Sequence, residues 1–289
     1  MIYILIIPAI TLILTVYAIP IFHYSWLSLH SSSVLTGLEA IPNQGANWNR
    51  LFGDSRFWID ASQTIRFAAS SVSIELLLAL GIAILLNTNF RNRGVIRSLT
   101  LLPWALPTTL MALSWRWIFN TPYGPIEQIN SIFSNNSLNV LTIPSLAWFA
   151  TVIADVWKTT PFIALILLAG LQTIPKDIYE AFKLEGGNSI QSFCKLTLPL
   201  LEPYIIISLL FRSAQAFGVF DLIQVMTGGG PAGTTESLGL YAYLNAMRYL
   251  DFGYSATIMI ASFVLLSTFC LIFWLIYKYL SKIINIAFS

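Results

Sequence analysis

The chain has 289 residues, of which 56% are hydrophobic and only 10% are charged, and its formal net charge is +2. A soluble domain carries about 25% charged residues. This chain is therefore too poor in charge to cover a water-facing surface, and we expect it to face a lipid bilayer instead. Cys194 and Cys270 lie far apart in the sequence with no second ligand at metal-binding spacing, so we predict two free thiols and neither a metal nor a cofactor.

Six apolar stretches are long enough to cross a bilayer, which takes about 20 residues per helix. They predict an all-α membrane protein with six transmembrane helices, organised as a single domain over residues 1–289. The first stretch is too long for the apolar core of a signal peptide, which favours a retained span. The predicted spans are residues 2–29, 62–86, 99–119, 145–171, 200–222 and 254–277.

The positions of lysine and arginine predict on which side of the membrane the termini lie. An even number of spans places both termini on the same side. With the N-terminus inside, eight basic residues fall in the inner segments and three in the outer loops, which favours cytoplasmic N- and C-termini. The inner eight are Arg91, Arg93, Arg97, Lys176, Lys183, Lys195, Lys278 and Lys282, and the outer three are Arg50, Arg56 and Arg248.

The outer loops and the prolines predict smaller features. Residues 31–61 are long enough for a small extracytoplasmic cap, and PIEQINSIF in the second outer loop is typical of an amphipathic helix lying flat on the membrane. Pro103, Pro107 and Pro161 are expected to kink the spans that contain them.

Ionisable residues within the spans are costly and usually face a cavity or a partner. Helical spacing places Asp155, Lys158, Thr159 and Phe162 on one face of the fourth span. The same spacing places Arg212, Gln215, Ala216 and Val219 on one face of the fifth span. We expect these faces to meet across a substrate cavity. The alternative is an Asp155–Lys158 or Asp155–Arg212 pair that only holds spans together.

Two further acidic residues are weaker candidates for that cavity. Glu75 lies in the second span, where it is expected to pair with a neighbouring helix. Asp221 lies at the outer end of the fifth span, where it marks the membrane edge.

The segment at residues 174–199 predicts two short helices on the cytoplasmic side. Pro175 and Asp177 are plausible at a helix start, Gly186 and Gly187 interrupt that helix, and Pro199 leads into the fifth span. Such a rigid knob would carry force from a soluble motor to the spans, with Glu180 and Glu185 pairing with basic residues on the motor. An ordinary solvated amphipathic loop fits the same pattern equally well.

This segment resembles the EAA loop of binding-protein-dependent ABC importer permeases, whose pattern is roughly E-A-A-x-x-D-G-A, nine further residues, then I-x-L-P. Phe182 stands for the second alanine, Glu185 for the aspartate and Gly187 for the third alanine. By this resemblance, the residues that contact the ATPase are Glu180, Ala181, Lys183, Glu185, Gly186 and Gly187. The matching positions are Glu180, Ala181, Gly186, Leu196, Leu198 and Pro199.

The resemblance to maltose-type sugar permeases extends over nearly the whole chain. It includes RSLTLLPWALPTTLMALSWRWIFN, DVWKTTPF and TGGGPAGTTESLGLYAYLNAMRYLDFGYSA, and the last of these points to the MalF- and SugA-like branch. The alignment places the sugar pocket at the two polar faces, together with Trp157. This chain is more charged there than the maltose protein.

The resemblance implies the type I fold of ABC importer permeases and an inner-membrane location. It implies a heterodimer with a MalG-like permease, two ATP-binding subunits, an extracytoplasmic solute-binding protein and transport by alternating access. No G-x-x-x-x-G-K-[ST] sequence occurs, so ATP hydrolysis is expected on the partner subunits and the chain is not itself an enzyme.

A proton-coupled secondary transporter using Asp155 or Glu75 is the alternative function, although no internal repeat supports it. Trehalose, maltodextrin, sucrose, glucosylglycerol and glycerol phosphate are substrates within the wider family. The compact polar lining favours a disaccharide or a glycosylated polyol.

Overall fold

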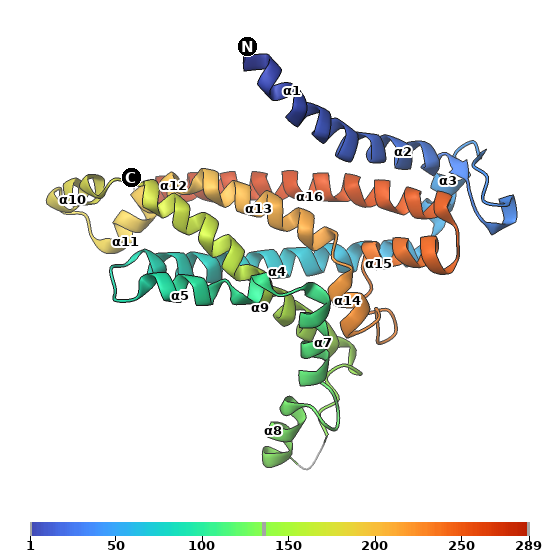
Figure 1. Cartoon of the computed structure of the whole chain (residues 1–289). Coiled ribbons are helices and arrows are strands. Elements are labelled where there is room, and N and C mark those ends of the chain that lie inside the picture. The colour runs from blue at the N-terminus through green and yellow to red at the C-terminus, as the bar shows by residue number, and fades with distance from the viewer. Residues whose placement is uncertain (1, 135–136, 288–289) are drawn as a thin grey trace. The chain divides into compact units, whose positions relative to one another are not determined.

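The computed structural model describes residues 2–134 and 137–287, and most of them are helical (Figure 1). The α-helices are α1 (Ile2–Ile13), α2 (Ile19–Ser28), α3 (Ala46–Gly53), α4 (Ser55–Asn87), α5 (Arg93–Thr100), α6 (Leu102–Ala105), α7 (Thr108–Ile118), α8 (Pro125–Phe133), α9 (Pro144–Thr173), α10 (Lys176–Leu184), α11 (Ser189–Ser192), α12 (Leu198–Leu200), α13 (Glu202–Phe217), α14 (Asp221–Met226), α15 (Leu238–Tyr243) and α16 (Phe252–Ala287). The π-helical turns are η1 (Leu14–Ala18), η3 (Phe193–Thr197) and η4 (Leu244–Arg248), the 3₁₀ turn is η2 (Val34–Thr36), and the strands are β1 (His30–Ser31) and β2 (Ile41–Pro42).

Residue contacts divide the chain into two compact units. The first contains Met1–Gln63 and Glu236–Leu265, and the second contains Thr64–Thr235 and Leu266–Ser289. The division falls within α4 and within α16, each of which is one continuous helix. The single-domain organisation that the sequence predicts stays a prediction.

The first unit packs the segment around β1 and α3 against α15 and the start of α16. β1 and β2 form an antiparallel pair, with His30 opposite Pro42. The apolar core of this unit includes Leu51, Phe57 and Tyr254, each at most 1% exposed. Residues of the predicted cap thus pack against the last helix, α16. Part of the predicted loop is itself helical, because α4 begins at Ser55 instead of residue 62.

A polar network holds the same unit together around Asp54. The hydroxyls of Tyr241 and Tyr254 both donate to Asp54 Oδ2. Burial alone would raise the pKa of the Asp54 carboxyl, but these two hydrogen bonds and backbone N–H donors hold the pKa below its ordinary value. Burial and the bond to Asp54 raise the pKa of Tyr241 to about 12, so its hydroxyl remains a donor at neutral pH. Arg56 also donates to both oxygens of Glu236, at 3.3 and 2.7 Å.

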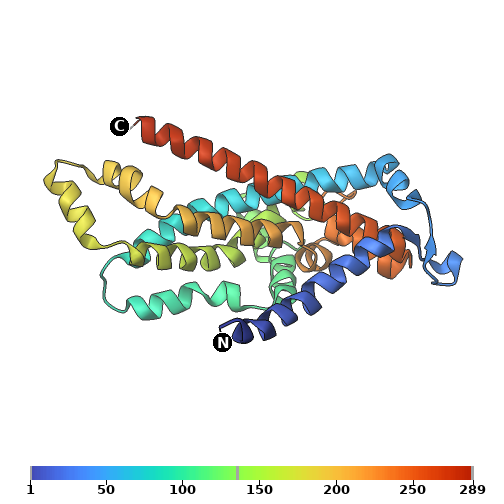
Figure 2. The ribbon, with the colours of Figure 1, turned by 90° about the horizontal axis from the view of Figure 1, so that it is seen from above.

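The second unit is built around α9, the most buried of the long apolar helices. Its core consists of two apolar clusters, one including Met111, Trp148 and Leu222 and the other including Ile163, Leu167 and Leu201. Figures 1 and 2 show α9 alongside α13 within this unit, with α10 and α11 beyond the end at which α9 finishes.

Close approach of α9 and α13 depends on Gly170. A Cβ atom at this position would lie 2.6 Å from the ring of Tyr204 and 2.8 Å from the side chain of Leu201. No real Cβ contact is this short, so a glycine is required where these two helices pack.

Four described helices are long and apolar enough to cross a bilayer, and counting each of two bent pairs as one span gives the predicted six. The third predicted span is not a single helix. Residues 93–105 and 108–118 meet at 86°, because Leu106 precedes Pro107 and takes an extended conformation. The kink predicted from Pro107 is thus a complete break of the helix.

The fifth predicted span begins at a second bend. Residues 189–200 and 202–217 meet at 62° around Leu201. The predicted amphipathic helix PIEQINSIF is present as α8, with Ile129, Ile132 and Phe133 exposed. The placement of α8 on the membrane surface, like the cytoplasmic location of the termini, stays a prediction.

Candidate functional site

Three charged side chains from three helices meet inside the second unit. Arg212 on α13 donates through Nε to Glu75 Oε2 on α4 at 2.5 Å, and through Nη2 to Glu75 Oε1 at 3.1 Å. Arg212 Nη2 also donates to Asp155 Oδ2 on α9. The side chains of Arg212, Glu75 and Asp155 are 2%, 0% and 9% exposed. We call these three residues the ionic cluster.

A threonine next to the cluster supplies a further hydrogen bond. Thr159 Oγ1 lies 2.8 Å from Glu75 Oε1 and 2.7 Å from the Asp155 backbone oxygen one turn earlier on α9. Thr160 Oγ1 likewise donates to the Val156 oxygen at 2.6 Å. These are bonds from a threonine hydroxyl to the carbonyl one turn earlier in the same helix, and they lie next to Pro161, which is inside α9 and has no backbone N–H to donate to the Trp157 oxygen.

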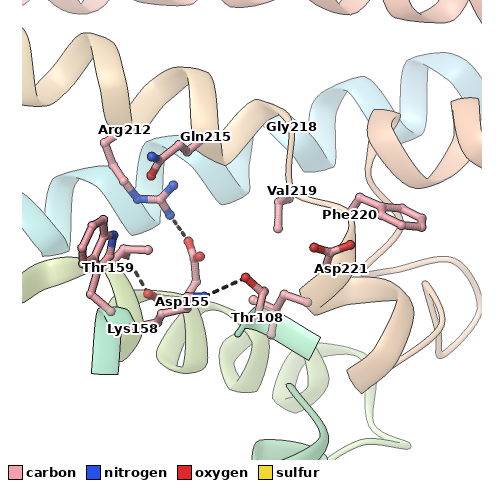
Figure 3. A pocket seen from close by; sticks show the side chains of 12 residues that line it. Thr108, Asp155, Lys158, Thr159, Arg212, Gln215, Gly218, Val219, Phe220 and Asp221 are labelled. Atoms are coloured by element: carbon pink, nitrogen blue, oxygen red, sulfur yellow. Dashed lines mark hydrogen bonds and ion pairs between the residues drawn. The ribbon is translucent and has the colours of Figure 1, made fainter. Parts of the chain in front are cut away.

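A cavity of about 510 Å³ lies against the cluster. Figure 3 shows Arg212 pointing toward Asp155, with Gln215 one turn further along α13. The cavity lining consists of Trp104, Thr108, Asp155, Lys158, Thr159, Arg212, Gln215, Gly218, Val219, Phe220, Asp221 and Leu222.

Lys158 is held by the broken third span. Its Nζ atom donates to Thr108 Oγ1 at 2.7 Å (Figure 3). Nζ also donates to the Leu106 backbone oxygen at 3.0 Å. Leu106 lies between α6 and α7, so no helical N–H is directed at its oxygen. A helix break inside a span is tolerated where the freed backbone group lines a cavity and finds a partner, and Lys158 is that partner here.

Six of the nine residues predicted for the substrate pocket line this cavity: Asp155, Lys158, Thr159, Arg212, Gln215 and Val219. The other three lie elsewhere. Trp157 is 44% exposed and its ring lies edge-on to Trp115. Phe162 stacks on Trp104, at 5.2 Å between ring centroids, and Ala216 is fully buried.

The two structural pairings considered from the sequence have different outcomes. The Asp155–Arg212 pair is present, whereas Lys158 makes its hydrogen bonds to Leu106 and Thr108. Glu75 pairs with a neighbouring helix as expected, and it proves to be the most buried member of the ionic cluster.

Sequence reasoning missed five lining residues: Trp104, Thr108, Gly218, Phe220 and Leu222. Trp104 and Thr108 adjoin the break at Pro107, and the spacing of Pro103 and Pro107 around Trp104 is the signal that would have found them. In the described part of the chain, no three His, Cys, Asp or Glu side chains are grouped as metal ligands would be.

The predicted helical knob has the expected form. α10 ends at Leu184, Gly186 has a positive φ of 89°, and α11 starts after Asn188. Asn188 and Gln191 cap α11 reciprocally: the Gln191 N–H donates to Asn188 Oδ1 at 2.8 Å, and the Asn188 N–H donates to Gln191 Oε1 at 3.0 Å.

Side chains on the knob are available for a partner. The side chains of Glu180, Lys183 and Glu185 are exposed, and Leu184 is 90% exposed. Phe182 is half-buried, and its ring occupies the space beside Gly187, where a Cβ atom would lie 2.2 Å from the ring. Two of the three departures from the EAA pattern therefore fit one another: the large ring of Phe182 leaves room only for a glycine at position 187.

Comparison with known proteins matches this chain to permease components of transport systems. The family model described as "Binding-protein-dependent transport system inner membrane component" matches residues 75–285. The trehalose/maltose transport system permease protein MalF of Thermococcus litoralis is 41% identical over 272 residues, which cover 94% of this chain and 91% of that protein. The trehalose transport system permease protein SugA of Mycobacterium tuberculosis is 32% identical over 271 residues, covering 94% and 86%.

The fold is also found in a solved structure. A chain in the crystal structure of a bacterial alginate ABC transporter, in complex with an alginate pentasaccharide-bound periplasmic protein, matches with a TM-score of 0.75 at 18% identity. The match covers 94% of this chain and 91% of that one, and confirms the predicted ABC importer permease fold. This chain therefore belongs to the family of binding-protein-dependent transport system inner membrane components, the multi-pass permease subunits of ABC importers.

Proposed function

We propose that this chain is one of two permease subunits of an ATP-driven importer, and that its solute is a sugar or a sugar-like molecule such as a disaccharide, an oligosaccharide or a glycosylated polyol. The observation that carries the proposal is the polar cavity between α9, α13 and the broken third span. It lies in a chain that is 41% identical to a trehalose/maltose permease along nearly its whole length.

The cavity offers the chemistry that a carbohydrate needs. A sugar hydroxyl both donates and accepts hydrogen bonds, and Gln215, Lys158 and Asp221 offer partners of both kinds from the lining. Trp104 adds an aromatic ring against which the apolar face of a sugar can pack. The volume of about 510 Å³ is of the size that holds a small ligand of a few rings.

The ionic cluster gives this cavity a fixed wall. Arg212 binds carboxylates from α4 and α9, so a contact between Arg212 and the substrate depends on the relative positions of three helices. Alternating access requires the solute to interact differently with two arrangements of the helices. Residues that join helices at the cavity wall are suited to that role.

The remaining partners follow from the same proposal. A MalG-like second permease completes a heterodimer, an extracytoplasmic binding protein delivers the solute, and two ATP-binding subunits drive the change of state. The exposed knob formed by α10 and α11 is the contact for one ATP-binding subunit, through Glu180, Ala181, Lys183, Glu185, Gly186 and Gly187. With the knob in the cytoplasm, both termini also lie there, in agreement with the distribution of basic residues.

Uptake of radiolabelled trehalose or maltose into sealed vesicles containing the complete transporter tests this function. Lys158→Ala removes a cavity cation without touching the ionic cluster, and Arg212→Ala removes the arginine that joins the three helices. We expect both variants to lower uptake at least about tenfold, whereas Arg248→Ala, an exposed arginine on η4, leaves uptake unchanged. The subunits should still assemble in Lys158→Ala, which makes it the decisive variant, because Arg212→Ala leaves the carboxylates of Glu75 and Asp155 buried without a counter-charge.

The energy source is tested in the same vesicles. Uptake should require ATP and persist after a proton uncoupler is added with ATP supply maintained. Normal uptake by Lys158→Ala and Arg212→Ala would contradict the cavity assignment, and loss of uptake on uncoupling would favour a proton-coupled transporter.

A further inference from the structure

A second cavity, here called the basic cavity, lies where α4 and α9 end. Its volume is about 690 Å³. The walls come from the end of α4 and the following loop, from α5, and from the segment that joins α9 to α10. The polar residues that face it include Asn87, Thr88, Asn89, Arg93, Arg97 and Lys176, and no carboxylate is among its lining residues.

The three cations of this cavity have no acidic partner in the described part of the chain. Among the residues that the structure describes, no ion pair joins Arg93, Arg97 or Lys176 to an acidic side chain. Arg93 donates only to the neutral amide oxygen Asn89 Oδ1, at 3.2 Å. Three like charges around one cavity repel each other, so an anion bound there would be stabilised by all three.

Arg97 is fixed in position for such an anion. Its Nη2 atom donates to the Leu86 backbone oxygen at 2.9 Å, at the end of α4 where carbonyl groups lack helical partners. Its Nε atom is buried and has no hydrogen-bond partner. A buried donor without a partner costs free energy, and an anionic oxygen in the cavity would supply the partner.

A smaller and more apolar cavity adjoins the basic cavity. An adjoining cavity of about 240 Å³ shares Asn87, Thr88, Leu171 and Tyr179 with it and is extended by Ile84 and Phe193. Two exposed apolar side chains, Val95 and Ile96, lie on α5 between the two arginines. Two apolar spans finish at this cavity, so it lies at the membrane–water boundary.

We propose that the basic cavity binds the phosphate group of an anionic phospholipid, with an acyl chain in the adjoining apolar cavity. The phosphodiester accepts hydrogen bonds from Arg93 and Arg97 and lies near the ammonium of Lys176. A soluble phosphate would satisfy the cations but leave the apolar extension unfilled. Basic pockets between spans at the membrane surface are suited to anionic lipid headgroups.

The test is titration of the purified complete transporter in detergent with phosphatidylglycerol or phosphatidylcholine, with bound lipid counted by native mass spectrometry. We expect the triple variant Arg93→Gln, Arg97→Gln, Lys176→Gln to bind phosphatidylglycerol at least about tenfold more weakly and phosphatidylcholine as before. Arg91→Gln is the single-charge control, because Arg91 lies on the loop just before α5 and carries the same charge but does not line the cavity. The double variant Arg93→Gln, Lys176→Gln keeps the Arg97–Leu86 bond and should show an intermediate loss.

Three outcomes would overturn the proposal. One is phosphatidylglycerol binding by the triple variant as tight as that of Arg91→Gln. Another is displacement of the lipid by millimolar inorganic phosphate, which would make the cavity a site for a soluble anion. The third is dissociation of the ATP-binding subunits from the triple variant while its lipid binding is unchanged, which would make the basic cavity a binding site for a protein partner. Because lipid binding is measured without sugar, failure to transport sugar would count against the proposed function alone.

Discussion

Arg212 and Glu75, which are 137 residues apart in the sequence, are joined side by side by two hydrogen bonds of 2.5 and 3.1 Å. Neither side chain is more than 2% exposed. A guanidinium and a carboxylate fit each other in this bidentate arrangement, which fixes both their distance and their relative orientation. The pair therefore sets how α4 and α13 lie together beside the cavity wall.

Removing Glu75 from this buried pair is expected to be destabilising. Glu75→Ala removes both hydrogen bonds of the pair, but Asp155 still balances the charge of Arg212, so we expect a loss below the roughly 3–5 kcal/mol that follows when a buried charge is left without any counter-charge. We expect a clear fall in the thermal unfolding temperature of the purified complex in detergent, measured by intrinsic tryptophan fluorescence. Asp177→Ala on the exposed α10 is the control, and an equal effect of the two variants would contradict the role of the pair.

The contact between Phe182 and Gly187 predicts a double-mutant effect on coupling. Gly187→Ala places a Cβ atom 2.2 Å from the Phe182 ring, so the knob must distort and the rate of ATP-driven uptake should fall several-fold. Adding Phe182→Ala removes the ring and should restore much of the rate. If the double variant is as slow as Gly187→Ala, steric conflict with the ring is not the cause.

The Asp54 network predicts an acid-sensitive contribution to stability. The pKa of Asp54 is lower in the folded protein than its ordinary value of 3.8. Its contribution is therefore fully present above pH 3.8 and is lost as the pH falls through the lower folded-state pKa. Asp54→Asn should reduce thermal stability at neutral pH and flatten the dependence of stability on pH below about 4.

Glu39→Gln provides the control for that titration, because Glu39 is an exposed acid in the same unit. We expect its melting curve to keep the pH dependence of the unmodified protein. An unchanged acid response in Asp54→Asn would show that other carboxyl groups are responsible.

The tight packing at Gly170 predicts sensitivity to any side chain. Gly170→Val would force Tyr204 and Leu201 away from α9, and overpacking of this kind costs about 1–3 kcal/mol. The expected result is a lower unfolding temperature and weaker assembly, measured by size-exclusion chromatography of the complex. Gly81→Val on α4, where nothing lies within 4 Å of an added Cβ atom, should be tolerated.

Much of the arrangement follows directly from the order of residue types along the chain. Runs of about 20 apolar residues have one favourable structure in a bilayer, because a helix satisfies its own backbone hydrogen bonds. The number and type of the spans were predictable for that reason, and so was the helical knob, whose Gly186 and Asn188 are local signals for a turn and a helix start.

Helix ends were less predictable. α4 begins seven residues earlier than the predicted second span, because one side of this added stretch, with Phe57, Asp60 and Ala61, is buried within the first unit. The break at Leu106 was predicted only as a kink, since a proline is compatible with either outcome and the choice depends on what the freed carbonyl contacts.

The sequence by itself determined that the chain crosses a membrane, which stretches are mainly helical, and where charges lie along them, because hydropathy, helical period and turn chemistry act over a few neighbouring residues. Only the tertiary structure decided that Glu75 joins Asp155 at Arg212, that Lys158 binds the carbonyl freed at Leu106, and that Trp157, Phe162 and Ala216 lie outside the cavity. Helical spacing gives the face on which a side chain lies. Which charges pair depends on how the helices pack, since a buried charge is stabilised by whichever partner lies within a few ångströms of it.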